Sequence, residues 1–298
     1  MNCILCGATE QECHFKNVED WEYQTYRAVD FTQCSRCRLI WQEPLPAPSI
    51  VPSFYPAQYR NFLPQQETLL SKLKAIQFRS MAALVSRGFR KNGKLLEIGF
   101  GNGQLLMALK DLGYLNLFGS DMVNASFPKL EAQGITVRGG NIEEAFPFDQ
   151  AFDGIIMNNV FEHLLTPLTV LKSCREHLEK GGRLVLITPN ANALELSIFH
   201  KYWAGFHSPR HIYLFNDDNV ALLKERGGFS QIGVEPVSDP GQWAISLQNL
   251  LQDHQRTRLP LKNGLAPYTV PLSLLFALPT VMQNFIKRST SMLCSLQA

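Results

Sequence analysis

The chain has 298 residues, of which 45% are hydrophobic, and a formal net charge of +2. This length and apolar content suffice for a full α/β core with a small appended module, and the charge is unremarkable. No charged leader followed by an apolar stretch and a cleavage site opens the sequence, so we expect a cytoplasmic protein rather than a secreted one.

Four cysteines form two closely spaced pairs near the start of the chain, Cys3-x-x-Cys6 and Cys34-x-x-Cys37. Two such knuckles offer four thiolates to a tetrahedral zinc ion, and strand-like residues from Tyr23 to Phe31 can form a hairpin between them. Cys13-His14 is a rival source of ligands. We therefore predict a structural Zn²⁺ held by the four paired cysteines in a zinc ribbon over residues 1–43.

Residues 44–66 form a connector that is rich in proline and tyrosine. Prolines at positions 44, 46, 48 and 52 stiffen its first part. Tyr55 and Tyr59 follow, and two interpretations are equally good: they cover a ligand of the main domain, or they only pack the linker onto it. A helix with periodic apolar residues is then expected from about Glu67 to Arg87, where it should flank a sheet.

The stretch from Leu95 to Gly103 organises the rest of the chain. Its apolar residues predict a strand that is buried on both faces, and residues 104–110 resume with helical character. Glycines at 99, 101 and 103 allow positive φ and remove side chains that would keep a ligand away. A flat or charged ligand can therefore lie against this turn, near the partly positive start of the helix.

The spacing of these glycines distinguishes between two cofactors. A dinucleotide fingerprint needs a third glycine at position 104, which is Gln104, so an NAD-dependent enzyme is disfavoured. The pattern G-x-G-x-G, with Glu97 two residues ahead, resembles the first motif of class I S-adenosylmethionine-dependent methyltransferases. The resemblance implies that Glu97 faces the amino end of the cofactor's methionine and that Gly99, Gly101 and Gly103 lie against the cofactor.

Three polar residues at later strand ends complete the predicted cofactor site. Asp121 ends the second strand, where the resemblance implies that its carboxylate accepts both ribose hydroxyls; the alternative is an N-cap of the next helix. Asn141 follows a short strand at 135–138, a place where such enzymes often put a polar residue beside the adenine. We also predict that Asn158, at the end of the fourth strand, binds the cofactor.

Strands alternate with helices from about residue 90 to 236, an order that predicts a doubly wound, mostly parallel sheet with ligands at the carboxyl ends of its strands. The fifth strand is expected at 183–188, the sixth at 229–237, and an antiparallel seventh at 291–296. The expected fold class is therefore α/β, a seven-stranded Rossmann-like methyltransferase sheet behind an N-terminal zinc ribbon. Its core spans 67–240 and 291–298, and residues 241–290 are an insertion.

Residues that follow the fourth strand are the first candidates for the chemistry. The segment from Asn159 to His163 is similar to the E-x-x-E-H segment of ubiquinone-biosynthesis O-methyltransferases, whose side chains hold a divalent cation. Asn159 replaces the first carboxylate, which disfavours a catalytic cation here. Glu162 and His163 either take part in catalysis or pack at the cofactor's edge and cap the next helix.

The loop after the fifth strand supplies the second candidates. Residues 203–215 hold His207, Arg210 and His211. In-line methyl transfer needs a positioned acceptor and, for a hydroxyl or amine, the removal of a proton. We predict that His207 or His211 is the general base and that Arg210 orients the substrate. The alternative is that Arg210 and His211 tie the loop to the sheet.

Part of the insertion, residues 263–286, is uncharged and has basic residues on both sides. Its prolines and polar side chains argue against a plain membrane span. We expect two short helices that either cover the active site as a soluble lid or lie at a membrane surface with their basic flanks near lipid phosphates. The predicted location is thus cytoplasmic, with peripheral membrane contact through 263–286 as the second interpretation.

Together these features predict a transferase that moves a methyl group from S-adenosyl-L-methionine to a small-molecule, sugar or lipid-type acceptor, most often on oxygen. The ribbon and connector resemble the entry segment of bacterial methyltransferases that carry a zinc ribbon. An RNA methyltransferase is one alternative, although residues 1–60 hold more Asp and Glu than Lys and Arg, which opposes a phosphate-binding module. A non-catalytic protein that binds the cofactor and a partner is another.

Overall fold

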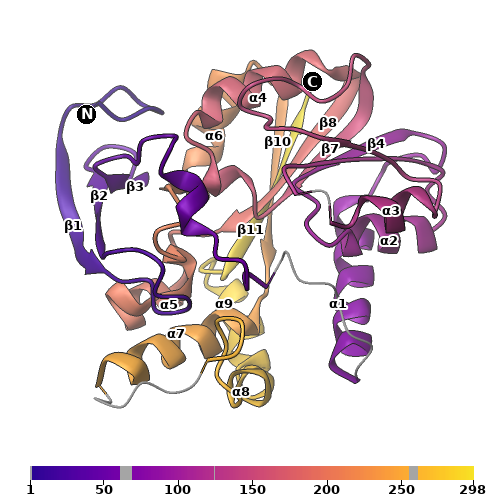
Figure 1. Ribbon diagram of the computed structural model, residues 1–298. Coiled ribbons are helices and arrows are strands. Elements are labelled where there is room, and N and C mark those ends of the chain that lie inside the picture. The colour runs from indigo at the N-terminus through magenta and orange to yellow at the C-terminus, as the bar shows by residue number, and fades with distance from the viewer. Residues whose placement is uncertain (1, 61–68, 124, 255–260) are drawn as a thin grey trace.

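The computed structural model describes residues 2–60, 69–123, 125–254 and 261–298, and this part of the chain forms two sheets (Figure 1). The larger sheet has seven strands in the order β10-β11-β8-β7-β4-β5-β6. β11 runs antiparallel to both of its neighbours, whereas β8, β7, β4, β5 and β6 are parallel. The doubly wound sheet expected from the sequence is therefore confirmed. Its strands are β4 (Lys94–Ile98), β5 (Asn116–Asp121), β6 (Thr136–Gly139), β7 (Phe152–Asn158), β8 (Leu178–Pro189), β10 (Gln231–Val237) and β11 (Ser291–Gln297).

Helices cover both faces of this sheet, and alternation along the strands decides which face each side chain meets. On β7, Ile155 and Met157 belong to the hydrophobic cluster that includes α4 and α6, whereas Ile156 belongs to the cluster that includes α1 and α2. The predicted helix at 67–87 is observed as α1, and residues 67 and 68 lie outside the described residues. The α-helices are α1 (Leu69–Val85), α2 (Gln104–Asp111), α3 (Phe127–Glu131), α4 (Pro167–Glu176), α5 (Leu194–Phe199), α6 (Asn219–Gly227), α7 (Pro240–His254), α8 (Thr269–Leu275) and α9 (Ala277–Phe285).

The second sheet joins the N-terminal ribbon to a loop of the main domain. Its four strands are arranged in the order β1 (Gln11–Val18), β2 (Val29–Cys34), β3 (Ile40–Glu43) and β9 (Tyr213–Leu214). β9 lies in the loop after β8 and pairs antiparallel with β3. The hairpin also differs from the sequence expectation, because most of the stretch from Tyr23 to Phe31 forms the turn and the strand begins only at Val29.

The ribbon and the main sheet share one hydrophobic core. Leu5, Leu39 and Trp41 of the ribbon are buried in the same cluster as Phe161 and Ile212 of the main domain. Packing is therefore continuous across residue 43, where the sequence analysis placed a domain boundary. Figure 1 shows the ribbon strands beside the carboxyl-terminal part of the sheet, with the connector helix η1 (Val51–Phe54) between them.

The region between β10 and β11 is helical. The predicted pair of short helices within 263–286 corresponds to α8 and α9, which follow the longer α7. Among the described residues, no helix combines the length and the apolar character that crossing a membrane requires.

Candidate cofactor and acceptor site

The glycine turn lies between β4 and α2, as the sequence predicts. Gly99, Gly101 and Gly103 have φ values of 73°, 56° and 75°, which residues with a Cβ rarely adopt. A Cβ on Gly99 would lie 2.4 Å from Val160 Cγ2, so this glycine is also needed for close packing against the segment after β7. The turn therefore brings the backbone of β4 next to the segment that carries Glu162 and His163.

Glu97, in β4, is a buried carboxyl at the base of this turn. It is 3% exposed, and its Oε2 atom has no hydrogen-bond partner among the described residues. Burial, assisted by the negative charge of Asp121, raises the pKa of Glu97 to about 8. An orphaned buried carboxyl oxygen beside a glycine turn fits the amino group of a methionine moiety, which would supply the missing donors.

Asp121 ends β5 and connects this strand to the turn. Its Oδ2 accepts a hydrogen bond from the Gly101 amide at 2.7 Å, and its Oδ1 accepts one from Val123 at 2.9 Å. Burial raises the pKa of Asp121 above its usual value. The following helix, α3, has Ser126 at its N-cap position, so Asp121 is not the N-cap that the alternative interpretation required.

Asn141 and Asn158 lie at the same edge of the sheet. The Gly140 amide donates to the Asp121 carbonyl at 3.2 Å, which places the turn containing Asn141 next to Asp121. The Asn141 Oδ1 atom accepts from the Glu143 amide at 3.1 Å. Asn158 is the last residue of β7, two strands from β5 across β4. The predicted cofactor residues are thus gathered along one edge.

His207 lies between the ribbon and the connector. Its Nδ1 atom is 2.6 Å from Glu22 Oε1, and its Nε2 atom is 3.2 Å from Tyr59 Oη. Burial alone would raise the pKa of Glu22, but His207 and Arg60 outweigh it and hold that pKa below its usual range. Burial lowers the pKa of His207 in spite of the neighbouring Glu22 carboxylate. Glu22 accepts the Nδ1 proton, and the Nε2 lone pair then faces both Tyr59 Oη and the Nε–H group of Arg210.

Arg210 is 1% exposed and binds the ribbon rather than a cleft. Its guanidinium donates to both carboxylate oxygens of Asp20, at 2.6 and 3.2 Å, and to the Phe54 carbonyl at 2.8 Å. Its Nε atom donates to His207 Nε2 at 3.0 Å. This geometry does not support the prediction that Arg210 orients the substrate, because its donors are turned into the protein. It favours the alternative, in which Arg210 fixes the loop.

His163 is near the turn and in contact with the connector. Its Nδ1 atom is 3.0 Å from both Tyr55 Oη and the Arg210 carbonyl. Burial lowers the pKa of His163 to about 3, so the ring is neutral at any physiological pH. Tyr55 and Tyr59 also contact each other, with ring centroids 5.2 Å apart. The two connector tyrosines therefore pack against His163, His207 and each other, which fits both interpretations of the connector.

His211 and Glu162 are buried more deeply. The Nδ1 atom of His211 is 2.7 Å from the Gly205 carbonyl, and its Nε2 atom is 3.7 Å from Glu162 Oε1. Burial raises the pKa of Glu162 to about 8. Ligand atoms of Glu162, His163 and His211 all lie within 4.8 Å of one another, a nitrogen and oxygen donor set that is compatible with a cation. Asn159, which replaces the family's first carboxylate, is exposed.

The four paired cysteines come together at the end of the ribbon. Sulfur atoms of Cys3 and Cys37, and those of Cys6 and Cys34, are 3.5 Å apart, and all four lie within 4.8 Å of one another. Zinc–sulfur bonds of about 2.3 Å in a tetrahedron place sulfurs about 3.8 Å apart, so this cluster fits a zinc ion. The side chain of Cys13 is not described.

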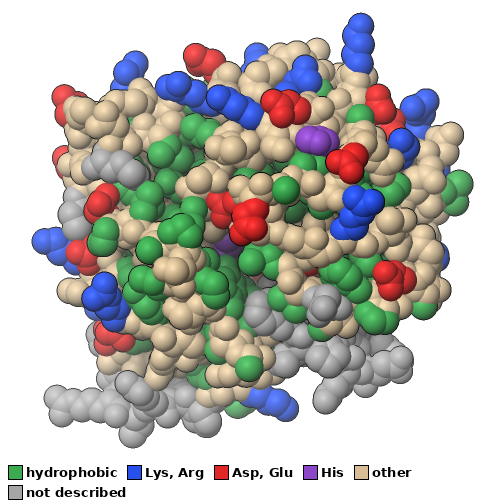
Figure 2. Space-filling model, turned by 45° about the horizontal axis from the view of Figure 1, so that its top comes forward, with side chains coloured by type: hydrophobic (Ala, Val, Ile, Leu, Met, Phe, Trp, Pro, Cys, Tyr) green, Lys and Arg blue, Asp and Glu red, His purple; other side chains and the backbone are tan. Residues whose placement is uncertain are grey.

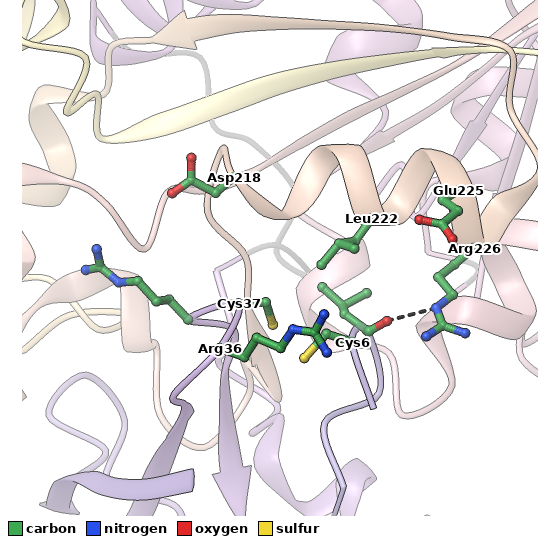
Figure 3. Close-up of a pocket in the computed structure, with 9 residues that line it drawn as sticks. Cys6, Arg36, Cys37, Asp218, Leu222, Glu225 and Arg226 are labelled. Carbon is green, nitrogen blue, oxygen red and sulfur yellow. Dashed lines mark hydrogen bonds between the residues drawn. The ribbon is translucent and has the colours of Figure 1, made fainter. Parts of the chain in front are cut away.

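Helix α6 holds these knuckles against the main domain. Asn219 Nδ2 donates to the Cys37 carbonyl at 2.7 Å, and Arg226 Nε donates to the Leu5 carbonyl at 2.8 Å. Figure 3 shows Cys6, Cys37 and Arg226 around an open cavity beside this helix. The cysteine cluster is thus anchored through the backbone carbonyls of its own loops.

The sequence analysis missed Asp20 and Glu22, which the structure buries almost completely from solvent. Only their position in a short run of acidic and aromatic residues, Glu19 to Tyr23, distinguishes them in the sequence. In the space-filling view, a hollow near the middle of the visible face has a histidine at its floor, acidic side chains at its rim and many hydrophobic ones around it (Figure 2).

A seven-stranded sheet with an antiparallel last strand, a glycine turn after β4, and carboxylates at Glu97 and Asp121 define a class I S-adenosylmethionine-dependent methyltransferase. Comparison with known proteins agrees. The model of the methyltransferase-domain family matches residues 73–233. The chain belongs to this family and is an S-adenosylmethionine-dependent methyltransferase.

Individual relatives give a finer picture. The chain is 35% identical over 167 residues to a ubiquinone biosynthesis O-methyltransferase of Cereibacter sphaeroides, a match that covers 52% of this chain and 67% of the relative. It is 27% identical over 182 residues to the enzyme of that name from Dinoroseobacter shibae, covering 54% and 70%. A methyltransferase from Haloferax volcanii, solved in complex with the Trm112 methyltransferase activator, has a TM-score of 0.51 at 14% identity over 77% of this chain and 92% of that one. The last likeness concerns the fold alone.

Proposed function

We propose that this methyltransferase methylates an oxygen of a small-molecule, sugar or lipid-type acceptor, with His207 as the general base. The observation that carries the proposal is the contact of His207 with Glu22 on one side and Tyr59 on the other. The names of the curated relatives support O-methylation of a small molecule. An RNA acceptor is disfavoured by the excess of acidic residues in the ribbon.

The cofactor supplies an electrophilic methyl group on a sulfonium. Glu97 would hold its amino end, the glycine turn would allow its methionine to approach the backbone, and Asp121 would accept the ribose hydroxyls. Asn141 and Asn158, at the same edge of the sheet, would contact the adenine side and the edge of the cofactor. Since methyl transfer is an in-line displacement, these residues act mainly by positioning.

The acceptor hydroxyl must lose its proton as the new carbon–oxygen bond forms. Glu22 would fix the tautomer of His207, so that the Nε2 lone pair faces Tyr59 Oη at 3.2 Å and Arg210 Nε at 3.0 Å. When the Arg210 Nε–H group releases Nε2, Tyr59 can take the acceptor's proton while it gives its own to Nε2, which makes His207 the final proton acceptor. His211 is less suited to this role because its Nδ1 is hydrogen-bonded to the Gly205 carbonyl and its Nε2 faces the buried carboxyl of Glu162 rather than a tyrosine hydroxyl. His163 and Glu162 would line the acceptor side next to the turn.

We also propose a structural zinc at Cys3, Cys6, Cys34 and Cys37, supported by the close approach of the four sulfurs. The protein would be cytoplasmic, with residues 263–286 touching a membrane peripherally. The exposed apolar side chains of α8 and α9 support this contact. With the ribbon, residues 44–60 of the connector would cover the acceptor side, and the described part of the core up to residue 240 would hold the cofactor.

A transfer assay tests the proposed base. His207→Gln, Glu22→Gln and His211→Gln would be incubated with S-adenosylmethionine and a panel of phenolic, sugar-nucleotide and lipid hydroxyl acceptors, and release of S-adenosylhomocysteine would be followed. We expect a loss of about 100-fold or more for His207→Gln, since general base catalysis typically contributes about 10²- to 10⁴-fold. Glu22→Gln should lose less, and His211→Gln least. Unchanged activity of His207→Gln would refute the assignment.

A further inference from the structure

Helices α8 and α9 carry an apolar surface that faces away from the protein. Seven of its side chains are between 49% and 84% exposed, with Phe285 the most exposed. On α9, Leu278, Val281, Met282 and Phe285 recur at helical spacing and form one stripe. We call this stripe and the exposed apolar residues that flank it the apolar face; its residues are Leu274, Leu275, Leu278, Val281, Met282, Phe285 and Ile286.

The inner side of α9 is polar, which reverses the usual order for a surface helix. Thr280 and Gln283 are buried, and the Gln283 amide faces the carboxyl of Glu195 in α5. Asn284 Nδ2 donates to Ser238 Oγ at 2.9 Å. If the apolar face turned inward, these hydrogen bonds would break, and the apolar side chains would pack against polar groups that had lost their partners. The hydrogen bonds therefore hold the apolar face outward.

An open cavity of about 510 Å³ begins where α9 ends. Lys287 and Arg288, the next residues of the chain, line it together with His14, Arg38 and His200. None of the described residues that line this cavity is acidic. Arg288 is fixed there because its Nε donates to the Asn192 carbonyl at 3.1 Å. A cavity with these cationic and imidazole side chains suits an anionic group.

The apolar face lies on the same side of the sheet as the cofactor edge. α9 leads directly into β11, and Ser291, at the start of β11, pairs with Pro189, the last residue of β8. Since the parallel strands all end at that edge, α9 approaches the sheet from the side on which the glycine turn lies. Figure 1 agrees, with α9 below the start of β11 and beside α5. An occupant of the apolar face is therefore near the side from which an acceptor enters.

We propose that this surface docks on an anionic lipid membrane, with the apolar face among the acyl chains and a lipid phosphate in the cavity lined by Lys287 and Arg288. The chain carries no Asp or Glu after Asp253, so the segment that forms α8, α9 and their basic end adds no acidic side chain that would repel a negative bilayer. The helices are too short to span, which is typical of an interfacial anchor. The inference rests on the proposed membrane contact and adds its headgroup site and its orientation.

A second copy of the chain is the other occupant to consider. In a two-fold pairing, the apolar face meets the apolar face of the second copy, whose segment after Asp253 has no acidic side chain for the cavity. An anionic bilayer, in contrast, offers phosphates to the same cationic side chains. The lipid surface is therefore the occupant that both the apolar face and the cavity fit.

Vesicle co-sedimentation of the full chain tests the proposal. Vesicles of phosphatidylcholine with phosphatidylglycerol would be compared with vesicles of phosphatidylcholine alone. The double variant Leu278→Ser/Phe285→Ser removes apolar area, and Lys287→Glu reverses a charge at the cavity. Matched controls are Leu115→Ser, whose parent side chain is 71% exposed, and Lys172→Glu on α4. We expect each test variant to bind anionic vesicles about tenfold less than the wild type, and each control to bind like the wild type.

Three results would overturn the inference in distinguishable ways. Equal binding of the wild type to both kinds of vesicle would remove the headgroup site and leave the membrane contact. A second outcome is that the wild type stays in the supernatant with both kinds of vesicle, while sedimentation velocity at the same protein concentration shows a dimer. If Leu278→Ser/Phe285→Ser abolishes that dimer, the apolar face belongs to a second copy. The wild type in the supernatant of both without such a dimer would remove the membrane contact as well. Titration with S-adenosylhomocysteine, unchanged in every variant, would show that the methyltransferase site survives in all three cases.

Discussion

The two halves of the active site are built in different ways. Apart from Asn158, the proposed cofactor half comes from residues 94–141, and it depends on backbone: positive φ in the glycine turn and amide hydrogen bonds to Asp121. The acceptor half is assembled from segments far apart in the chain, such as Glu22 and His207, which are 185 residues apart. Buried charges and imidazoles, rather than backbone, hold it together.

This difference indicates that the ribbon is packed into the main domain and, if His207 is the proposed base, also positions it. Its strand β3 pairs with β9, and its Asp20 neutralises the buried Arg210. Damage to the ribbon should therefore destabilise the acceptor half and leave the cofactor half largely intact. The predictions below test this separation, from the largest expected effect to the smallest.

Loss of the cysteine cluster should have the largest effect. Zinc binding supplies on the order of 10 kcal/mol in small zinc modules, so Cys37→Ser should lose the metal and unfold the ribbon end of the protein. The measurement is zinc content by mass spectrometry together with urea unfolding. Cys174→Ser, a buried cysteine of α4 outside the cluster, is the control and should keep one zinc ion per chain. Equal zinc content in both variants would contradict the assignment.

Asp20→Ala should have the next largest effect. It leaves the guanidinium of Arg210 buried without its carboxylate, and removing one partner of a buried pair typically costs about 3–5 kcal/mol. The free energy of unfolding in urea measures it. Glu235→Ala, which breaks the exposed pair with Arg87, is the control and should cost about 1 kcal/mol or less. If the two variants were equally stable, the Asp20–Arg210 pair would not hold the ribbon to the loop.

A smaller effect is expected from pH on the cofactor half. Burial raises the pKa of Glu97 from its ordinary value in the unfolded chain to about 8 in the folded protein. The protonated carboxyl therefore contributes fully to the free energy of unfolding below the ordinary pKa, and this contribution is lost as the pH rises to about 8. Stability of the ligand-free protein should fall over this window, with up to about 1.4 kcal/mol per pH unit from this carboxyl. Glu97→Gln should reduce the slope, and Glu235→Gln should not. If the free energies of unfolding of the wild type and Glu97→Gln changed in parallel with pH, the raised pKa of Glu97 would be excluded.

The sequence predicts these two halves unequally, and the reason is physical. Gly99, Gly101, Gly103 and the strands around them follow local rules of turn geometry and hydrophobic period, so the sheet and the cysteine pairs were accessible from spacing alone. The pairing of Glu22 with His207 depends on how a distant hairpin packs, which no local pattern encodes. Arg210 shows the same limit: its position after β8 was predicted, but its partner Asp20 was not.

Calorimetric titration with S-adenosylhomocysteine tests the central claim most directly, because it separates the two halves. The wild type should bind near the micromolar range, about −8 kcal/mol. Asp121→Ala should bind at least about tenfold more weakly through the loss of hydrogen bonds to a charged group, whereas His207→Gln should bind like the wild type. Absence of heat up to millimolar ligand, in protein shown to be free of copurified cofactor, or equal weakening by both substitutions, would contradict the account.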